Sequence, residues 1–445
     1  MRSIFFMIAI FAALPLALVF PFVGVLLWAW TSFSSLYRET FGFASDFPFN
    51  FYIAATTMVA WLISTEPKNL PNQMLPVFAI LLAVWMSVST YFAIDYASAY
   101  PLWLNYIKTM LLVLVTMAMT SNKLRIQAFI WIIVLSIGYY AAKGGGFMLL
   151  TGSIGSRVFG AENSMIEDNN NLSLAIVITL PLLNYLRVTS RSTWVKAACV
   201  GLLALSIVAI VGTYSRGGFV GLVVVGGAFL VSSRKKSVPL ITTLAVVGGV
   251  LMFAPGDWFD RVNTIQTYKE DSSSVGRLNS WQTSWNLAQD RPIVGGGFAA
   301  TENQRIYRRY KGRGDSTDSR AAHSIYFQVL GDLGFVGLGL YIAMLGAGVY
   351  NLLLVQRWTT GREDLDWANM LARMLLVSTV GFVTAGALLS MAYYDAFLCM
   401  MALSVALREV VRTSAQSVAA EPSPSVDPTA GFVPAWRRAS LKNRD

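Results

Sequence analysis

Residues 195–232 read VKAACVGLLALSIVAIVGTYSRGGFVGLVVVGGAFLVS. Two apolar runs, 195–213 and 218–232, are separated by a short turn whose one charged residue is Arg216. An α-helix needs about 20 apolar residues to cross the hydrocarbon core of a bilayer. Because lipid offers the backbone no hydrogen-bond partners, such runs cross a membrane as helices. The stretch therefore predicts a pair of transmembrane helices joined by a tight turn.

The same pattern recurs along the whole chain of 445 residues. Hydrophobic residues make up 55% of the sequence and charged residues 13%, against roughly 25% charged residues in a soluble domain. A soluble enzyme, a secreted disulfide scaffold and a disordered chain are therefore excluded. We expect an all-α polytopic membrane protein of about 12 transmembrane helices, with apolar runs at 3–33, 47–65, 74–93, 101–120, 125–142, 171–186, 195–213, 218–232, 237–254, 324–355, 369–391 and 395–411.

The first apolar run leaves the number of helices open. It contains Pro15 and Pro21, and proline removes a backbone hydrogen bond from a helix interior. Residues 3–33 form either one kinked span or two short ones, so that the total is 12 or 13.

The basic residues predict the orientation of the helices. The net charge is +10, and lysine and arginine concentrate in the linkers 66–73, 121–125, 187–196 and 233–236. The positive-inside rule places these linkers in the cytoplasm, so the 143–170 loop and the turn at 214–218 face outward. The charge is explained by this topology and does not call for a nucleic-acid partner. We divide the chain into an N-terminal transmembrane bundle (1–254), an outer segment (255–323), C-terminal transmembrane helices (324–411) and a cytoplasmic tail of disordered composition (412–445).

The outer segment is the only sizeable region outside the membrane, and loops of this length are usually functional. Residues 278–289 carry Trp281 and Trp285 four positions apart, which predicts a short amphipathic helix with both rings on one face. The rings would pack on the bundle or rest at the lipid interface. The helix should end before Pro292, and the glycines at 295–297 predict a flexible turn.

Arg216 is the first candidate for binding an anion. The glycines after it let the chain reverse tightly and approach a ligand closely. At the outer membrane boundary its guanidinium would form a bidentate contact with a phosphate, and the adjacent Tyr214 and Ser215 would also contact the substrate. The alternative is an interfacial arginine that snorkels to lipid phosphates and anchors the helix ends.

Arg277 and His323 are the other two catalytic candidates. Arg277 comes just before the tryptophan-bearing helix, and a helix N-terminus beside an arginine attracts anions. His323, the single histidine, lies where the outer segment re-enters the membrane. An unperturbed imidazole titrates near pH 6.5, which suits a general base acting on a hydroxyl. The alternatives are an ordinary solvated arginine and a capping or interfacial histidine without a catalytic role.

Several further basic residues would bind an anionic glycan or a lipid head group, unless they are merely solvated. They are Arg305, Arg308, Arg309 and Arg320 upstream of His323, with Arg157 in the third outer loop. Trp281 is a further substrate-binding candidate. No metal site is predicted, because there is one histidine and both cysteines, Cys199 and Cys399, lie inside apolar runs.

These stretches together resemble the O-antigen ligase and O-antigen polymerase superfamily of bacterial envelope glycosyltransferases. The resemblance is carried, in the order of the family, by Thr213–Gly218, Gly276–Leu278 with Trp281, Arg291–Phe298, Ala322–Tyr326 and Leu333–Leu338. Gly42–Phe49 and Ser156–Gly160 with Asp168–Asn171 resemble the subgroup of O-glycosylation ligases. Ser324 departs from the pattern, since the family often has asparagine after the histidine.

The resemblance implies a GT-C-like fold in the bacterial inner (cytoplasmic) membrane, with the active site facing the periplasm. The donor would be a glycan on undecaprenyl diphosphate, moved en bloc to an acceptor hydroxyl, which for a ligase belongs to a sugar of lipid A–core. Apart from these substrates and the membrane lipids, the resemblance implies no partner. It implies no nucleotide sugar, no metal and no other cofactor.

We therefore expect Arg216 and Arg277 to stabilise the negative charge that grows on the leaving diphosphate, supported by Arg157 or by a member of the basic cluster at 305–313. His323 would accept the proton of the acceptor hydroxyl. A polymerase or a protein O-glycosylation ligase would use the same donor and chemistry. A transporter would more naturally carry paired charges at mid-membrane in two related halves, and a non-catalytic scaffold would tolerate loss of Arg216 and His323.

Overall fold

The computed structural model describes residues 2–40, 43–151, 157–232, 272–312 and 321–420. These residues form helices and connecting loops, with no β-strand among them. Seven helical stretches in the described ranges are long and apolar enough to cross a membrane. They are α5 (Met74–Tyr91), α6 (Tyr96–Met119), α7 (Lys123–Thr151), α8 (Asn169–Thr189), α9 (Thr193–Gly212), α15 (Ile325–Thr359) and the run of η3 (Glu363–Leu365), α16 (Asp366–Ala385) and η4 (Gly386–Leu388). The protein is thus a polytopic helical membrane protein.

Four shorter helices are also apolar: α1 (Arg2–Val19), α2 (Pro21–Ser34), α4 (Phe49–Ile63) and α10 (Arg216–Ser232). The first apolar run forms two helices, because the chain leaves helical geometry at Phe20 and Pro21 begins α2. The short η1 (Leu36–Glu39) and α3 (Phe43–Asp46) lead from α2 to α4. The predicted span at 237–254 lies outside the described residues, so the total of about 12 stays a prediction.

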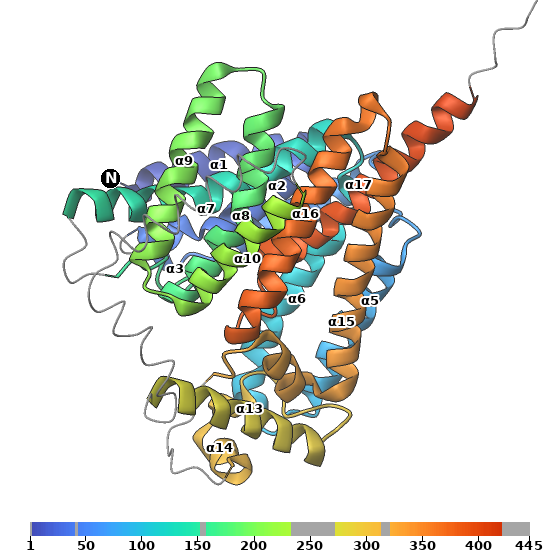
Figure 1. Ribbon diagram of the computed structural model, residues 1–445. Coiled ribbons are helices and arrows are strands. Elements are labelled where there is room, and N and C mark those ends of the chain that lie inside the picture. The colour runs from blue at the N-terminus through green and yellow to red at the C-terminus, as the bar shows by residue number, and fades with distance from the viewer. Residues whose placement is uncertain (1, 41–42, 152–156, 233–271, 313–320, 421–445) are drawn as a thin grey trace, which may run out of the picture.

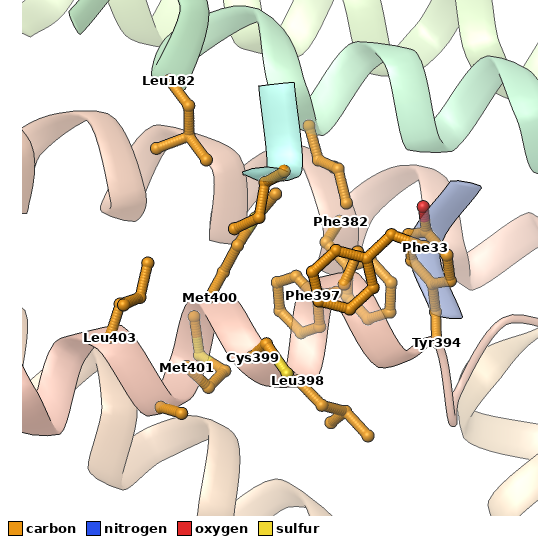
Figure 2. Close-up of a cluster of buried hydrophobic side chains, with 14 of the residues drawn as sticks. Phe33, Leu182, Phe382, Tyr394, Phe397, Leu398, Cys399, Met400, Met401 and Leu403 are labelled. Atoms are coloured by element: carbon orange, nitrogen blue, oxygen red, sulfur yellow. The ribbon is translucent and has the colours of Figure 1, made fainter. Parts of the chain in front are cut away.

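The centre of the bundle is the start of α17 (Asp395–Ala420) and the loop before it, where every residue from 391 to 407 is buried. A helix that is apolar on all sides is the one that its neighbours surround. Phe397 of α17 stacks on Phe382 of α16, and Phe33 of α2 and Leu182 of α8 belong to the same cluster (Figure 2). Helices far apart in sequence therefore meet around α17.

The other helices pack in pairs around this centre (Figure 1). α7 lies along α9, α8 along α16, and α10 contacts both α8 and α16. α15 and α5 run side by side, with α6 next to α5. Pairing of this kind brings the N-terminal end of α10 and the N-terminal end of α15 to the loop that joins η4 to α17, residues 389–394.

Two helices of the outer segment, α13 (Ser272–Asp290) and α14 (Gln304–Tyr310), lie beyond one end of the bundle (Figure 1). α13 packs on α15. Trp281 stacks on Phe327 and Trp285 meets Phe335 edge-on. Of the two environments predicted for the tryptophans, the structure therefore has packing on the bundle. α14 and η2 (Ala300–Glu302) pack against α13 around a small second core, and η2 also contacts α15. The outer segment is thus a folded cap on the bundle.

α15 is broken at Gly334, whose φ of 71° and ψ of −170° are open to glycine alone among the residues. The break leaves carbonyls 331–333 without helical partners, and other segments donate to them. Amides 296 and 297 bond the carbonyls of residues 331 and 332 at 2.8 and 3.0 Å, and the Trp85 indole bonds the carbonyl of residue 333 at 3.0 Å. The glycines at 295–297, predicted as a flexible turn, are instead packed against this break, because only glycine allows so close an approach of two backbones.

The same glycine turn is fastened to the connection between α5 and α6. The amide of Ile94 donates to the carbonyl of Gly296 at 2.9 Å. Asp95, which caps α6, accepts from the Asn303 side chain at 2.7 Å and from Ser98. These hydrogen bonds lower the pKa of the Asp95 carboxyl. The cap is therefore held to the bundle at two places, through α15 and through the α5–α6 connection.

Candidate functional site

Arg216 is the first residue of α10 and follows a strained turn. Tyr214 has a φ of 54°, and the Ser215 hydroxyl accepts a hydrogen bond from the amide of Gly218 at 3.0 Å. Ser215 is only 3% exposed, so its side chain caps the helix rather than facing solvent. A Cβ at Gly218 would collide with Ser173 of α8. The glycine is needed for close packing, and the packing fixes the direction in which α10 begins.

Arg157 is carried to the same turn by the loop before α8. The amide of Val158 donates to the carbonyl of Gly212 at 3.0 Å, and the Asn169 side chain donates to the carbonyl of Thr213 at 2.6 Å. Arg157 itself is exposed. The structure thus places Arg157 and the 213–216 turn at the same end of the bundle.

The 389–394 loop joins the start of α10 to the start of α15. The Leu389 side chain lies against Gly217, the residue after Arg216. The Ser390 hydroxyl accepts a hydrogen bond from the amide of His323 at 2.7 Å. Two further bonds run from the loop to α15: the amide of residue 392 to Gln328 at 3.1 Å and the Tyr393 hydroxyl to Asp332 at 3.2 Å. Arg216 and His323, 107 positions apart in the sequence, are therefore on two segments that meet at one loop.

His323 lies just before α15 with a φ of 47°. Few side chains other than glycine, asparagine, aspartate and histidine adopt this left-handed conformation readily. The preceding carbonyl, that of Ala322, accepts a hydrogen bond of 2.8 Å from the Trp281 indole. His323 is thus held from two sides, by Ser390 and, through its neighbour, by Trp281.

Arg277 lies inside α13 and not in front of it, because α13 begins at Ser272. The expected combination of a helix N-terminus with an adjacent arginine is wrong at this position. The helical pattern of 278–289 extends backward through the serines at 272–274, which are suited to a helix start. Arg277 precedes Trp281 by one turn, and residues four apart share a helix face. The face of α13 that reaches Ala322 therefore carries Arg277 as well.

Trp281, predicted to bind substrate, packs on Phe327 and bonds the carbonyl of Ala322 in the structure. Trp281→Phe keeps the ring that stacks on Phe327 and removes the indole donor to Ala322. One hydrogen bond contributes about 0.5–1.5 kcal/mol, so amide exchange of the 321–325 segment should rise about two- to ten-fold. Hydrogen–deuterium exchange of the purified protein measures this. The matched control is Trp285→Phe on the same helix, and equal exchange in both variants would contradict the role given to Trp281.

The three arginines of α14 lie farther out. Arg305, Arg308 and Arg309 are exposed, and Arg309 lies over the Tyr310 ring. The helix is fixed to α13 by Tyr310, which bonds Asp290 at 2.5 Å and accepts from Asn286 at 2.8 Å. In Figure 1, α13 lies between α14 and the bundle. The structure therefore does not bring these arginines to His323, and Arg320 lies outside the described residues.

Sequence reasoning missed Ser390, which bonds the amide of His323, and three residues of the cavity that Ala322 also lines. Ser390 and Gln328 carry no signal, since polar residues of their kind occur throughout the chain. Asp332 could have been found, because a charge inside the apolar run 324–355 marks a functional candidate by default. Glu302 stands out no more in the sequence than the other acidic residues of the outer segment. Its side chain opens onto a cavity of about 100 Å³ that Ala322 and Asp332 also line.

Within the described ranges, no group of three or more histidine, cysteine, aspartate or glutamate residues is placed to hold a metal ion. Independence from metals stays a prediction.

Comparison with known families gives two matches. Residues 201–342 match the family model described as O-Antigen ligase, and residues 1–191 match a family of unknown function (DUF5935). The first match contains Arg216, Arg277 and His323, whereas Arg157 falls in the second. The resemblance to the O-antigen ligase and polymerase superfamily is thereby confirmed. A comparison with curated protein sequences gave no match.

Proposed function

Because residues 201–342 match the O-antigen ligase family, we propose that the protein is a membrane glycosyltransferase that moves a glycan en bloc from undecaprenyl diphosphate to an acceptor hydroxyl. The acceptor that we favour is a sugar of lipid A–core. The reaction takes place at the periplasmic face of the bacterial inner membrane and uses no metal or other cofactor. The donor, the acceptor and the location come from the resemblance.

The observation that supports this proposal most strongly is the meeting of three segments at one place. The start of α10, the start of α15 and the inner face of α13 all contact the 389–394 loop or the residue before His323. Each segment carries one of the residues with chemistry, Arg216, His323 and Arg277. A structural arginine or histidine would not require this common placement.

The proposed reaction gives Arg216, Arg277 and His323 one role each. The bond between the anomeric carbon and the diphosphate oxygen breaks with its electron pair going to the diphosphate, and the acceptor oxygen forms the new bond to that carbon. Arg216 and Arg277 lower the barrier by stabilising the charge on the diphosphate. His323 takes the proton from the acceptor hydroxyl as the bond forms and later releases it to water.

Two related activities share this chemistry. A polymerase would extend a glycan still attached to its lipid carrier, and a protein O-glycosylation ligase would use a serine or threonine hydroxyl. They differ from the favoured ligase only in the acceptor. A transporter is less favoured, because the candidate residues gather at one end of the bundle rather than in two related halves.

The test is transfer by the purified protein from a lipid-diphosphate glycan to purified lipid A–core, with and without a chelator. Capped lipid A–core is the expected product, and the chelator should leave the rate unchanged. A ladder of glycan lengths on the carrier would instead show a polymerase. No transfer to any hydroxyl acceptor would contradict the proposal.

Within this assay, Arg216→Ala should lower the transfer rate about 10²–10³-fold, which is the usual effect of removing one donor that stabilises charge in a transition state. Arg191→Ala is the matched control, since Arg191 is an exposed arginine. It lies just before the first residue of α9, whereas Arg216 lies just after the last. Equal rates in both variants would show that Arg216 only anchors the helix ends.

A further inference from the structure

The cavity beside His323 lies between three segments. It has a volume of about 100 Å³ and is lined by residues of α6, of the 299–302 segment and of the first part of α15. Its polar lining consists of Tyr106, Thr301, Glu302, Gln328 and Asp332. Ala322, the neighbour of His323, forms part of the wall. The cavity is therefore next to the residue that would take a proton from the acceptor.

Asp332 is a fixed part of this wall. It is 4% exposed, and its two carboxylate oxygens accept from the amide of Ala299 at 3.1 Å and from the Tyr393 hydroxyl at 3.2 Å. Gln328 uses its side-chain oxygen to accept from the amide of residue 392. Its side-chain amide donors form no hydrogen bond within the described part of the chain.

Glu302 and Tyr106 differ from Asp332 in this respect. Within the residues that the structure describes, neither the Glu302 carboxylate nor the Tyr106 hydroxyl has a hydrogen-bond partner. The Tyr106 ring is held between Phe298 at 4.9 Å and Tyr393 at 4.4 Å, so its hydroxyl has a fixed direction. Glu302 is an exposed residue whose side chain lines the cavity. Its carboxylate is therefore open to a hydrogen-bond donor that a ligand supplies.

The charge of the cavity restricts the ligand. Two of the lining residues are acidic, and none of them, all within the described ranges, is basic. A phosphate or a sugar carboxylate would be repelled, whereas hydroxyl groups can donate to Glu302 and accept from Gln328 or Tyr106. The positive charge that would attract the diphosphate is that of Arg216, which lies on α10 and not in the cavity wall.

We propose that this cavity binds the uncharged, hydroxyl-bearing sugar of the acceptor and presents one of its hydroxyls to His323. The proposal rests on the proposed glycosyl transfer and names the site of its second substrate. The donor sugar is the less suitable occupant, because it is attached to a diphosphate that the acidic wall repels. Glu302 holds the acceptor through a charge-assisted hydrogen bond, and Tyr106 and Gln328 set its orientation.

The experiment measures binding and transfer separately with the full-length protein. Binding of core oligosaccharide released from lipid A, which needs no turnover, is compared for the wild type, Glu302→Gln and Tyr106→Phe. A hydrogen bond to a charged group contributes about 1.5–3 kcal/mol, so Glu302→Gln should weaken binding about ten-fold or more. Tyr106→Phe keeps the packed ring and should weaken binding less. Glu162→Gln, at an exposed glutamate in the loop before α8, should bind as the wild type does.

In the transfer assay Glu302→Gln should raise the KM for the acceptor and leave the KM for the lipid-linked donor unchanged. A raised donor KM would place the donor sugar in the cavity and overturn the proposal, as would unchanged oligosaccharide binding in both cavity variants. Oligosaccharide binding that depends on Glu302 in a protein without transfer activity would support the cavity and contradict the proposed function. The two proposals can therefore fail independently.

Discussion

Replacing His323 with asparagine is expected to lower the rate of glycan transfer about 10²–10⁴-fold, the usual contribution of a general base. Asparagine is chosen because residue 323 has a φ of 47°. Asparagine adopts the left-handed region readily, whereas alanine would add about 1–2 kcal/mol of strain. The variant therefore removes the base and keeps the backbone that Ser390 and Trp281 hold.

The rate of transfer should be measured as a function of pH at concentrations of both substrates that saturate the enzyme. A base must be deprotonated to act, so the wild-type rate should fall as the pH is lowered, and this fall should vanish in the variant. His323→Gly, which also accommodates the positive φ, serves as a second substitution. A variant with near-normal transfer and an unaltered pH profile would remove His323 from the mechanism.

Replacing Gly334 with alanine is expected to destabilise the fold and to abolish transfer together with it. Glycine is the only residue that adopts its φ and ψ without a cost of about 1–3 kcal/mol. A Cβ would also come within 2.5 Å of the carbonyl oxygen of Ile293 and 2.7 Å of that of Pro292. Those carbonyls belong to the backbone that fastens the outer cap, so the cap cannot move away without losing its hydrogen bonds.

The midpoint of thermal unfolding in detergent measures this effect, with Gly339→Ala as the matched control. Gly339 lies on the same helix, α15, and a Cβ there would meet no atom within 4 Å. Alanine favours a helix interior over glycine by about 1 kcal/mol, so the control should unfold at the same temperature or slightly higher. If both variants unfold at the wild-type midpoint, the break in α15 is not required for folding.

Much of the bundle follows from hydropathy alone. The seven long membrane helices correspond to runs read directly from the sequence, since lipid forces long apolar segments into helices. Pro21 marks the start of α2 because proline favours the first turn of a helix. The sequence predicts Arg216 at a turn between two apolar runs, and the structure has it as the first residue of α10, directly after that turn. Features of this kind depend on short stretches of neighbouring residues.

The parts that could not be predicted depend on distant contacts. The glycines at 295–297 read as a flexible turn, and nothing nearby in the sequence shows that the break at Gly334 supplies carbonyls for their amides. Ser390 and Glu302 are ordinary polar residues until the fold places them beside His323 and the cavity. Arg277 was placed before its helix because serines at 272–274 fit a loop as well as a helix start.

The central position of α17 has a consequence for how the protein is made. α2, which packs against α17, is synthesised long before its partner emerges from the ribosome. At about 5–20 residues per second, the roughly 360 residues between them take on the order of 20–70 s. During that interval the earlier helices are already in the membrane, with the polar groups and aromatic rings that will face α17 still uncovered. The position that α17 will occupy therefore stays open, shielded by lipid or by an insertion factor, until α17 is made.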